Sequence, residues 1–185
     1  HIKVLFIVFI ILWLISFVFS YNQNKKGIIM SGKIAKLLIS KDTQSDMLNV
    51  NQIVLEIGKG IFGDRYYNQE GTFSNKGEIE PDRDVTLIEI EKIDALNKEN
   101  DLNITAEDFR RNIVVSNCDL NSLVGKEFQI GEVVLKGLRL CEPCKYLSNK
   151  LDNEKVLSQM VHKAGLRAQI IKGGSIDLNS QVEVK

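Results

Sequence analysis

The stretch Val133-Val-Leu-Lys-Gly-Leu-Arg-Leu-Cys-Glu-Pro-Cys-Lys-Tyr-Leu147 joins a strand pattern to a pair of thiols. Its first residues are mostly apolar and predict a β-strand. Cys141 and Cys144 follow with Cys-x-x-Cys spacing. Pro143 rigidifies the backbone just before Cys144 and, because it has no N–H, stops the strand from pairing further. We therefore expect a sheet to end where chemically reactive side chains begin.

Two cations, Arg139 and Lys145, flank this pair of cysteines. Nearby positive charge favours the thiolate, which is the form that attacks electrophiles or binds metals. The chain has 3 cysteines, an odd number that does not indicate a disulfide scaffold, so we expect a reducing compartment. A zinc site would need a second pair of ligands, for which Cys118 and His162 are a poor substitute.

The composition is that of a globular protein of ordinary size. Of 185 residues, 44% are apolar and 26% are charged, with 24 basic and 24 acidic side chains. This balance gives no general attraction to nucleic acid or to an anionic membrane surface. Any site for an anionic ligand must therefore be local, and no nucleic-acid partner is expected.

Residues 1–29 differ in character from the single domain that we expect over residues 30–185. Val4 to Phe19 form an apolar run close to the ~20 residues that span a bilayer. Positive charge is heavier after this run, so a spanning segment would hold the domain at the cytoplasmic face of the membrane. Two alternatives stay open: an extension upstream of a true start at Met30, and a signal peptide, although no typical cleavage site follows. The domain itself is expected to be cytoplasmic.

Short strand patterns recur at intervals of about ten residues, which is typical of a barrel or sandwich. Besides the strand before the cysteines, the predicted strands are Lys33–Ser40, Ile53–Ile57, Arg110–Ser116, Leu166–Lys172 and Gln181–Val184, the last two joined by a turn at Gly173–Ser175. Leu123–Gly131 predicts a short turn followed by a strand. The pattern favours a mainly β fold with some α, an antiparallel barrel of the α+β type.

Helices are predicted at only three places. Thr86–Glu89 has capping-box spacing and introduces a helix over Ile88–Asn100. Thr105–Asp108 predicts a single helical turn, and Asp152–Lys163 a helix with Val156, Leu157, Met160 and Val161 buried. Gly165 is expected to end that helix. The polar stretch Asn68–Arg83 predicts an exposed loop.

Several segments together resemble the MOSC domain, named for the C-terminal domain of molybdenum-cofactor sulfurase, in its small stand-alone bacterial form. They occur in the order typical of that family and cover nearly everything from Gly32 to Val184. The segments are Met30–Ile34, Gly63-Asp-Arg-Tyr-Tyr67, Arg110-Arg-Asn-Ile-Val114, Leu123–Gly131, Leu140-Cys-Glu-Pro-Cys-Lys-Tyr-Leu147 and His162-Lys-Ala-Gly-Leu-Arg-Ala168.

The resemblance implies a β-barrel with a few peripheral helices and a molybdenum cofactor (molybdopterin), a pterin dithiolene that carries a phosphate. It implies an oxidoreductase acting on N-hydroxylated or N-oxide compounds, with electrons supplied by a donor protein. The alternative is a sulfur carrier that holds persulfide sulfur from a pyridoxal-phosphate cysteine desulfurase. Either activity is an expectation, so whether the chain is an enzyme stays open at this point.

Cys144, in Pro-Cys-Lys, matches the position of the family's functional cysteine. Its thiolate is a soft ligand able to bind molybdenum, and equally a nucleophile able to accept sulfur. Cys141 has three possible roles: a second catalytic or resolving thiol, a second ligand, or a packed residue.

A pterin phosphate needs fixed donors, which the planar fork of arginine supplies. The residues that the resemblance predicts to bind the cofactor are Arg65, Arg110, Arg111, Asn112, Lys145 and Arg167. Asp64 is expected to orient Arg65 or to accept a hydrogen bond from the pterin ring. The alternative for the arginines is a set of surface salt bridges with the acidic residues.

Overall fold

A computed structural model describes residues 30–72, 74, 80–143 and 158–184. The residues from Met30 to Val184 form one compact unit. The apolar run of residues 4–19 lies outside the described residues. Within the part of the chain that is described, no helix is both long and apolar enough to span a membrane.

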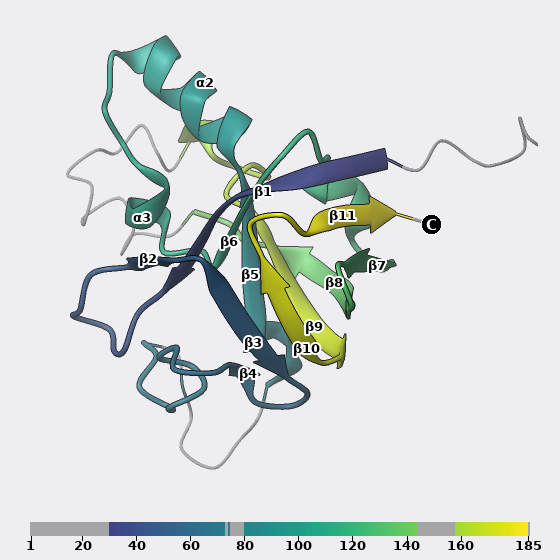
Figure 1. Ribbon diagram of the computed structural model, residues 1–185. Helices are drawn as coiled ribbons and strands as arrows, with labels where there is room; N and C mark the ends of the chain where they lie inside the picture. Colours follow the sequence, from purple (N-terminus) through teal and green to yellow (C-terminus); the bar gives the residue numbers. More distant parts are fainter. Residues whose placement is uncertain (1–29, 73, 75–79, 144–157, 185) are drawn as a thin grey trace, which may run out of the picture. The chain divides into compact units, whose positions relative to one another are not determined.

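The unit is built on a closed β-barrel (Figure 1). Its strands run in the order β11-β7-β8-β9-β5-β6-β1, and pairing of β1 with β11 closes the ring. All neighbours are antiparallel except β5 and β6, which are parallel. The barrel strands are β1 (Met30–Ile39), β5 (Val85–Glu89), β6 (Ile113–Ser116), β7 (Glu127–Ile130), β8 (Val133–Leu140), β9 (Leu166–Lys172) and β11 (Gln181–Val184).

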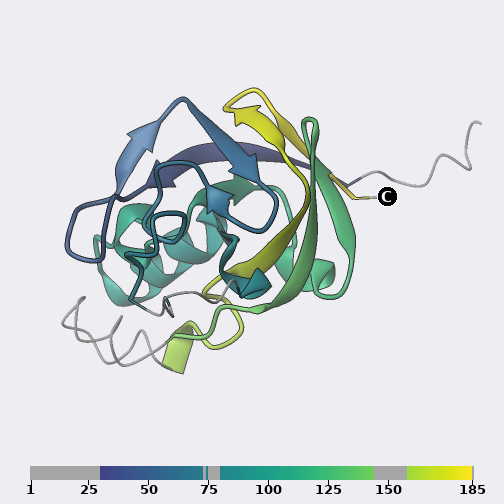
Figure 2. The ribbon, with the colours of Figure 1, turned by 90° about the horizontal axis from the view of Figure 1, so that it is seen from below.

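Smaller elements decorate the barrel. Helix α2 lies on one side of it and strands β3 and β4 on the opposite side, as the view from below in Figure 2 also shows. A short strand, β2 (Leu48–Val50), extends from β1, and a separate sheet has the order β10-β3-β4. The remaining elements are β3 (Gln52–Glu56), β4 (Gly60–Ile61), β10 (Gly174–Asp177), α2 (Ile90–Asn100), α3 (Ala106–Phe109) and the 3₁₀ turns η1 (Pro81–Arg83) and η2 (Leu120–Leu123). The fold class predicted from the sequence is therefore confirmed.

The barrel interior is filled by alternate residues of its strands. In β9, Leu166, Ala168 and Ile170 are buried, whereas the residues between them are partly exposed. A second core lies outside the barrel, where the two α-helices pack on the outer face of β1, β5 and β6. Ile93 and Leu96 of α2 and Phe109 of α3 belong to this second core. The outer face of the barrel is therefore partly covered.

Most predicted elements are confirmed, but the helix start at Thr86 is wrong. Residues 85–89 form strand β5, all five residues of which are buried, and α2 begins only at Ile90. The capping-box spacing is fortuitous because Thr86 pairs with Arg167 of β9. The capping box of Thr105 and Asp108 is present at the start of α3, as predicted.

The predicted helix over Asp152–Lys163 lies largely outside the described residues. Its described end is helical only at residues 158–159, and residues 160–163 form a turn. Met160 is fully buried as predicted, but Val161 is 44% exposed, so its predicted burial is wrong. The predicted turn at Gly173–Ser175 is also wrong in part, because Gly174 begins strand β10 and pairs with Leu55.

Candidate functional site

Side chains from three neighbouring strands meet on the outer face of the barrel. Arg139 of β8 lies directly opposite Arg167 of β9, and Arg167 lies opposite Thr86 of β5. Their neighbours Leu87 and Leu166 point into the barrel core. Because side chains alternate between the faces of a strand, the two arginines and Thr86 share the outer face.

Asp82, in η1, holds the two arginines. Arg139 donates through Nε to Asp82 Oδ2 at 2.9 Å, and Arg167 donates through Nη1 to the Asp82 carbonyl oxygen at 3.2 Å. Arg167 Nη1 also lies 3.9 Å from Asp82 Oδ2. We call Asp82, Arg139 and Arg167 the Asp82 cluster. The sequence predicted an exposed loop at Asp82, but its side chain is only 21% exposed.

Two atoms of the Asp82 cluster are buried without a hydrogen-bond partner. Among the described residues, such atoms are Asp82 Oδ1, Arg167 Nε and Glu107 Oε2. An unpaired buried polar atom costs about 1–3 kcal/mol, so its presence calls for an explanation. The cluster concentrates one unused acceptor and one unused donor at neighbouring side chains.

A second set of predicted residues forms a buried network around Asp64. Its Oδ2 accepts hydrogen bonds from Ser40 N at 3.1 Å, Arg65 Nη1 at 3.2 Å and Asn112 Nδ2 at 3.1 Å. The Oδ1 of Asn112 accepts in turn from the Thr86 hydroxyl at 2.8 Å. Asp64 therefore orients Arg65. Through Thr86 the network reaches β5, the strand that pairs with β9 and so with Arg167.

Arg65 and Arg110 direct donors into the protein. Their exposed fractions are only 5% and 8%. Arg65 Nη2 donates to the Arg110 carbonyl oxygen at 2.9 Å. Arg110 donates to the carbonyl oxygens of Ser45 at 2.8 Å and Asp42 at 2.9 Å. These donors brace the loop after β1, and surface salt bridges do not describe either arginine.

Cys141 and Arg111 meet at the turn that leads into β9. The backbone N–H of Cys141 donates to the Gly165 carbonyl oxygen at 2.7 Å, and Arg111 Nε donates to the Ala164 carbonyl oxygen at 2.9 Å. Cys141 is 2% exposed. The structure thus brings these two predicted residues to the same turn, beside the strands that carry Arg139 and Arg167.

The same turn is tied to the residue after Cys141. Glu142 accepts from the His162 backbone N–H at 2.9 Å and lies 2.6 Å from the His162 ring Nδ1. These hydrogen bonds, the backbone one foremost, lower the pKa of the Glu142 carboxyl. The sequence had not predicted this pair.

Two predicted site residues, Cys144 and Lys145, lie outside the described residues. The third cysteine, Cys118, is part of the barrel core. Burial, with smaller contributions from Glu89 and nearby acids, raises the pKa of the Cys118 thiol to about 11. Cys118 is therefore a thiol at neutral pH and is unsuited to nucleophilic chemistry.

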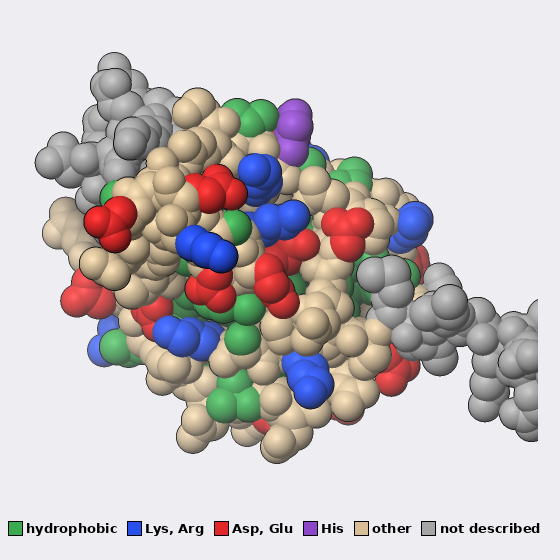
Figure 3. All heavy atoms as spheres, turned by 90° about the horizontal axis from the view of Figure 1, so that it is seen from above, with side chains coloured by type: hydrophobic (Ala, Val, Ile, Leu, Met, Phe, Trp, Pro, Cys, Tyr) green, Lys and Arg blue, Asp and Glu red, His purple; other side chains and the backbone are tan. Residues whose placement is uncertain are grey.

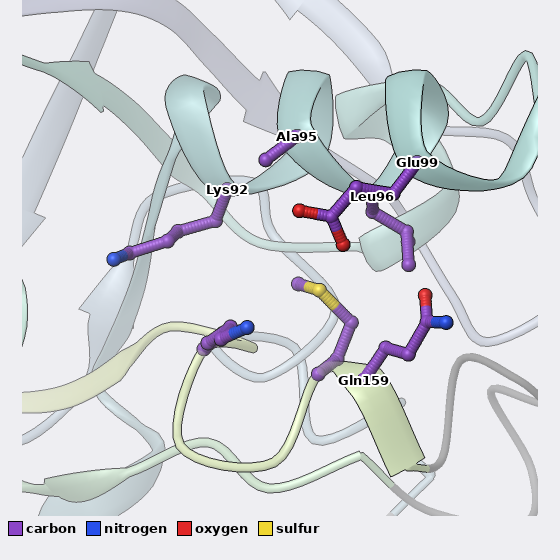
Figure 4. A pocket seen from close by; sticks show the side chains of 7 residues that line it. Lys92, Ala95, Leu96, Glu99 and Gln159 are labelled. Carbon is purple, nitrogen blue, oxygen red and sulfur yellow. The ribbon is translucent and has the colours of Figure 1, made fainter.

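A small pocket between α2 and residues 159–163 is separate from these clusters (Figure 4). Its volume of about 140 Å³ is well below the ~300–1,000 Å³ of typical ligand pockets. On the face shown in Figure 3, Lys and Arg side chains are interspersed with Asp and Glu. The pocket is lined by Lys92, Ala95, Leu96, Glu99, Gln159, Met160 and Lys163.

Sequence reasoning missed Asp82 and did not assign Arg139 to the site. Arg139 was noticed only as a cation near the cysteines. Its alignment with Arg167 depends on the β8–β9 register, which includes a bulge between Gly137 and Arg139. Alternation within each strand gives the face of a side chain but not its partner on the next strand.

The fold is shared with solved bacterial proteins. YuaD from Bacillus subtilis has a TM-score of 0.70 and 20% sequence identity, over 84% of this chain and 96% of YuaD. YiiM from Geobacillus stearothermophilus gives 0.63 and 14%, over 83% of this chain and 75% of that one. YiiM from Escherichia coli gives 0.62 and 18%, over 84% and 70% respectively.

No curated protein sequence matches the chain. A model of the MOSC domain, however, matches residues 58–183, which include the Asp82 cluster, Asp64 with Arg65 and Asn112, and the Cys-x-x-Cys stretch. Together with the barrel, this match shows that the chain belongs to the MOSC domain family.

Proposed function

We propose that this chain binds a molybdenum cofactor and acts as an oxidoreductase toward N-hydroxylated or N-oxide compounds. Membership of the MOSC family supports a role related to that cofactor. The observation that carries the proposal is the position of the Asp82 cluster. Arg139 precedes Cys141 by two residues, about 7 Å of extended chain, on the strand that leads to Cys144.

The Asp82 cluster offers hydrogen-bonding groups suited to a polar cofactor. The unpartnered Arg167 Nε offers a fixed donor, and Asp82 Oδ1 a fixed acceptor. Arg139 is 58% exposed and has further donors for a ligand at the surface. A buried apolar wall would offer none of these contacts. When bound, the cofactor would supply the two-electron chemistry that removes an oxygen atom from the substrate.

The residues of this chain would hold and orient the cofactor. Cys144 is the proposed molybdenum ligand, because its thiolate is a soft donor at the family's cysteine position. Cys141 and Arg111 fix the turn at residues 164–165 on which the next strand begins. The Asp64 network serves as the rigid support behind Thr86. Lys145 supplies positive charge near the thiolate.

Electrons would come from a separate donor protein. The direct test supplies them artificially, with a chemically reduced viologen dye and an amidoxime as the N-hydroxylated substrate. Consumption of the dye should depend on the amidoxime and should be lost in Cys144→Ser. The matched control Cys118→Ser changes a thiol of the barrel core and should keep its activity once its fold is confirmed by circular dichroism.

The sulfur-carrier alternative gives a different result in the same preparation. Neither the wild-type protein nor Cys144→Ser would consume the reduced viologen dye in the presence of the amidoxime. The intact mass of the wild-type protein, but not of Cys144→Ser, would be raised by one sulfur atom after incubation with a cysteine desulfurase and cysteine. That outcome would replace the oxidoreductase proposal.

A further inference from the structure

We infer that Asp82 and Arg167 recognise the 2-amino-4-oxopyrimidine edge of a pterin, rather than a phosphate group. The inference rests on the proposed function and specifies which part of the cofactor this cluster binds. The sequence resemblance had given Arg167 to the phosphate. The cluster has one buried unused acceptor and one buried unused donor, and this pair determines which ligand groups fit it.

The unused atoms are held in place by their neighbours. One oxygen of Asp82 is committed to Arg139 Nε at 2.9 Å, which leaves the other oxygen, Oδ1, as the unused acceptor. Arg167 is fixed to the Asp82 carbonyl oxygen through Nη1 at 3.2 Å, which leaves Nε as the unused donor. Donor and acceptor therefore belong to one hydrogen-bonded unit.

The backbone of this unit is fixed as well. Asp84 follows η1 and accepts from the backbone N–H of Ile170 in β9 at 3.0 Å. Its own backbone N–H donates to the Pro81 carbonyl oxygen at 3.4 Å. The turn that carries Asp82 is thus attached to the same strand that carries Arg167. A pair fixed in this way favours ligands whose own donor and acceptor match it.

A phosphate group matches only half of the pair. Its oxygens could accept from Arg167, but an ionised phosphate oxygen has no proton to donate to Asp82 Oδ1 and would lie beside a carboxylate of the same charge. A lactam edge matches both halves, because an N–H and a carbonyl oxygen lie next to each other. In a pterin the carbonyl oxygen would accept from Arg167 Nε, while the ring N–H and the amino group would donate to Asp82 Oδ1.

The place of the cluster suits this assignment. Arg139 and Arg167 are paired across β8 and β9, and Cys141 lies two residues further along, about 7 Å of extended chain. A pterin ring bound at the cluster would therefore lie close to the end of the strand that leads to the proposed metal ligand. The phosphate would then be bound by other groups.

Two fluorescent ring systems test the inference without any enzyme activity. Pterin carries the amino group and lumazine carries an oxygen at the same position, so only pterin can donate there to Asp82. The full chain would be produced in cells unable to make molybdopterin, and the fluorescence anisotropy of each compound would be followed as protein is added. We expect pterin to bind at least tenfold more tightly than lumazine, and millimolar phosphate not to displace it.

The variants separate recognition from folding. Asp82→Asn should reduce the preference for pterin at least tenfold, because its amide can donate to the lumazine oxygen. Arg167→Gln should weaken both compounds. The matched control Asp94→Asn changes an exposed acid of α2 and should leave the preference unchanged. Circular dichroism and thermal melting show whether each variant is folded.

Equal binding of pterin and lumazine by the folded wild-type protein would overturn the inference, as would displacement of pterin by phosphate. Absence of pterin binding would also overturn it, and the proposed function would survive that result if the complete cofactor still co-purified from ordinary cells. If no cofactor co-purified either, both would fail.

Discussion

The backbone N–H of Cys141 donates to the carbonyl oxygen of Gly165 at 2.7 Å. This bond joins the end of β8 to the start of β9, so the Cys-x-x-Cys stretch leaves the barrel at a defined point. Gly165 is therefore a structural requirement of the site as well as of the fold.

Replacing Gly165 by Ala should destabilise the protein strongly. Its φ of +109° is rarely adopted by residues with a side chain, and a Cβ there would lie 2.1 Å from the Leu87 carbonyl oxygen. We expect a loss of about 3 kcal/mol or more in the free energy of unfolding. Urea denaturation measures this loss.

Gly58→Ala is the matched control, because the φ of Gly58 is +69° but nothing lies within 4 Å of the added Cβ. Its cost in the free energy of unfolding should be about 1–2 kcal/mol. Equal losses for the two variants would contradict the close approach of Gly165 to the Leu87 carbonyl oxygen.

The pH dependence of stability should carry a contribution from Asp84. Burial, the largest cause, raises the pKa of this carboxyl from 3.8 to about 6. A raised pKa means that the contribution of Asp84 to stability is complete below pH 3.8 and is lost as the pH rises through about 6.

Asp84→Asn cannot ionise and keeps an oxygen for the Ile170 N–H. The free energy of unfolding of the variant, relative to that of wild type, should increase by on the order of 1 kcal/mol as the pH is raised from 4 to 8. Thermal melting at both pH values measures this gain. A difference between variant and wild type that does not change with pH would show that the Asp84 carboxylate is not disfavoured in the fold.

The Asp64 network should be essential for stability. Asp64→Ala removes an acceptor that the Ser40 N–H, the buried Arg65 guanidinium and the Asn112 amide share. Removing one partner of a buried charged pair typically costs about 3–5 kcal/mol. Urea unfolding of Asp64→Ala should show a loss of this size, whereas Asp94→Ala on the surface of α2 should change little. A loss below 1 kcal/mol would mean that the network does not brace the fold.

Cys118 should resist alkylation in the folded protein. Its pKa of about 11 leaves almost no thiolate at pH 8, and its side chain is buried. Iodoacetamide treatment followed by peptide mass mapping should find Cys118 unmodified in the native state and modified in urea. Modification of native Cys118 at the rate of a free thiol would contradict its place in the core.

The sequence predicts the barrel better than it predicts the site. Alternation identified β9 correctly, because Leu166, Ala168 and Ile170 mark one buried face. It failed at Thr86, where a local capping pattern coincides with a strand whose conformation is decided by pairing with β6 and β9. Local patterns do not include such long-range pairing, which is why the helix was predicted to begin too early.

The site residues also depend on contacts between segments that are far apart in the sequence. Arg65, Arg110 and Asn112 were predicted from a resemblance, and the structure joins them through Asp64 and a shared loop. The role of Asp82 could not be predicted, because it depends on the register between β8 and β9 and on where η1 lies against them. That register is set across a connection of more than twenty residues, which no local pattern specifies.

Binding of the molybdenum cofactor is tested by the molybdenum and pterin content of the full chain purified from molybdate-fed cells. Elemental analysis would give the metal, and the fluorescence of oxidised pterin would give the organic part, in wild type and in Cys144→Ser. We predict near-stoichiometric molybdenum and pterin in wild type and loss of the metal in the variant. Wild-type protein with neither metal nor pterin would show that this chain does not bind the cofactor.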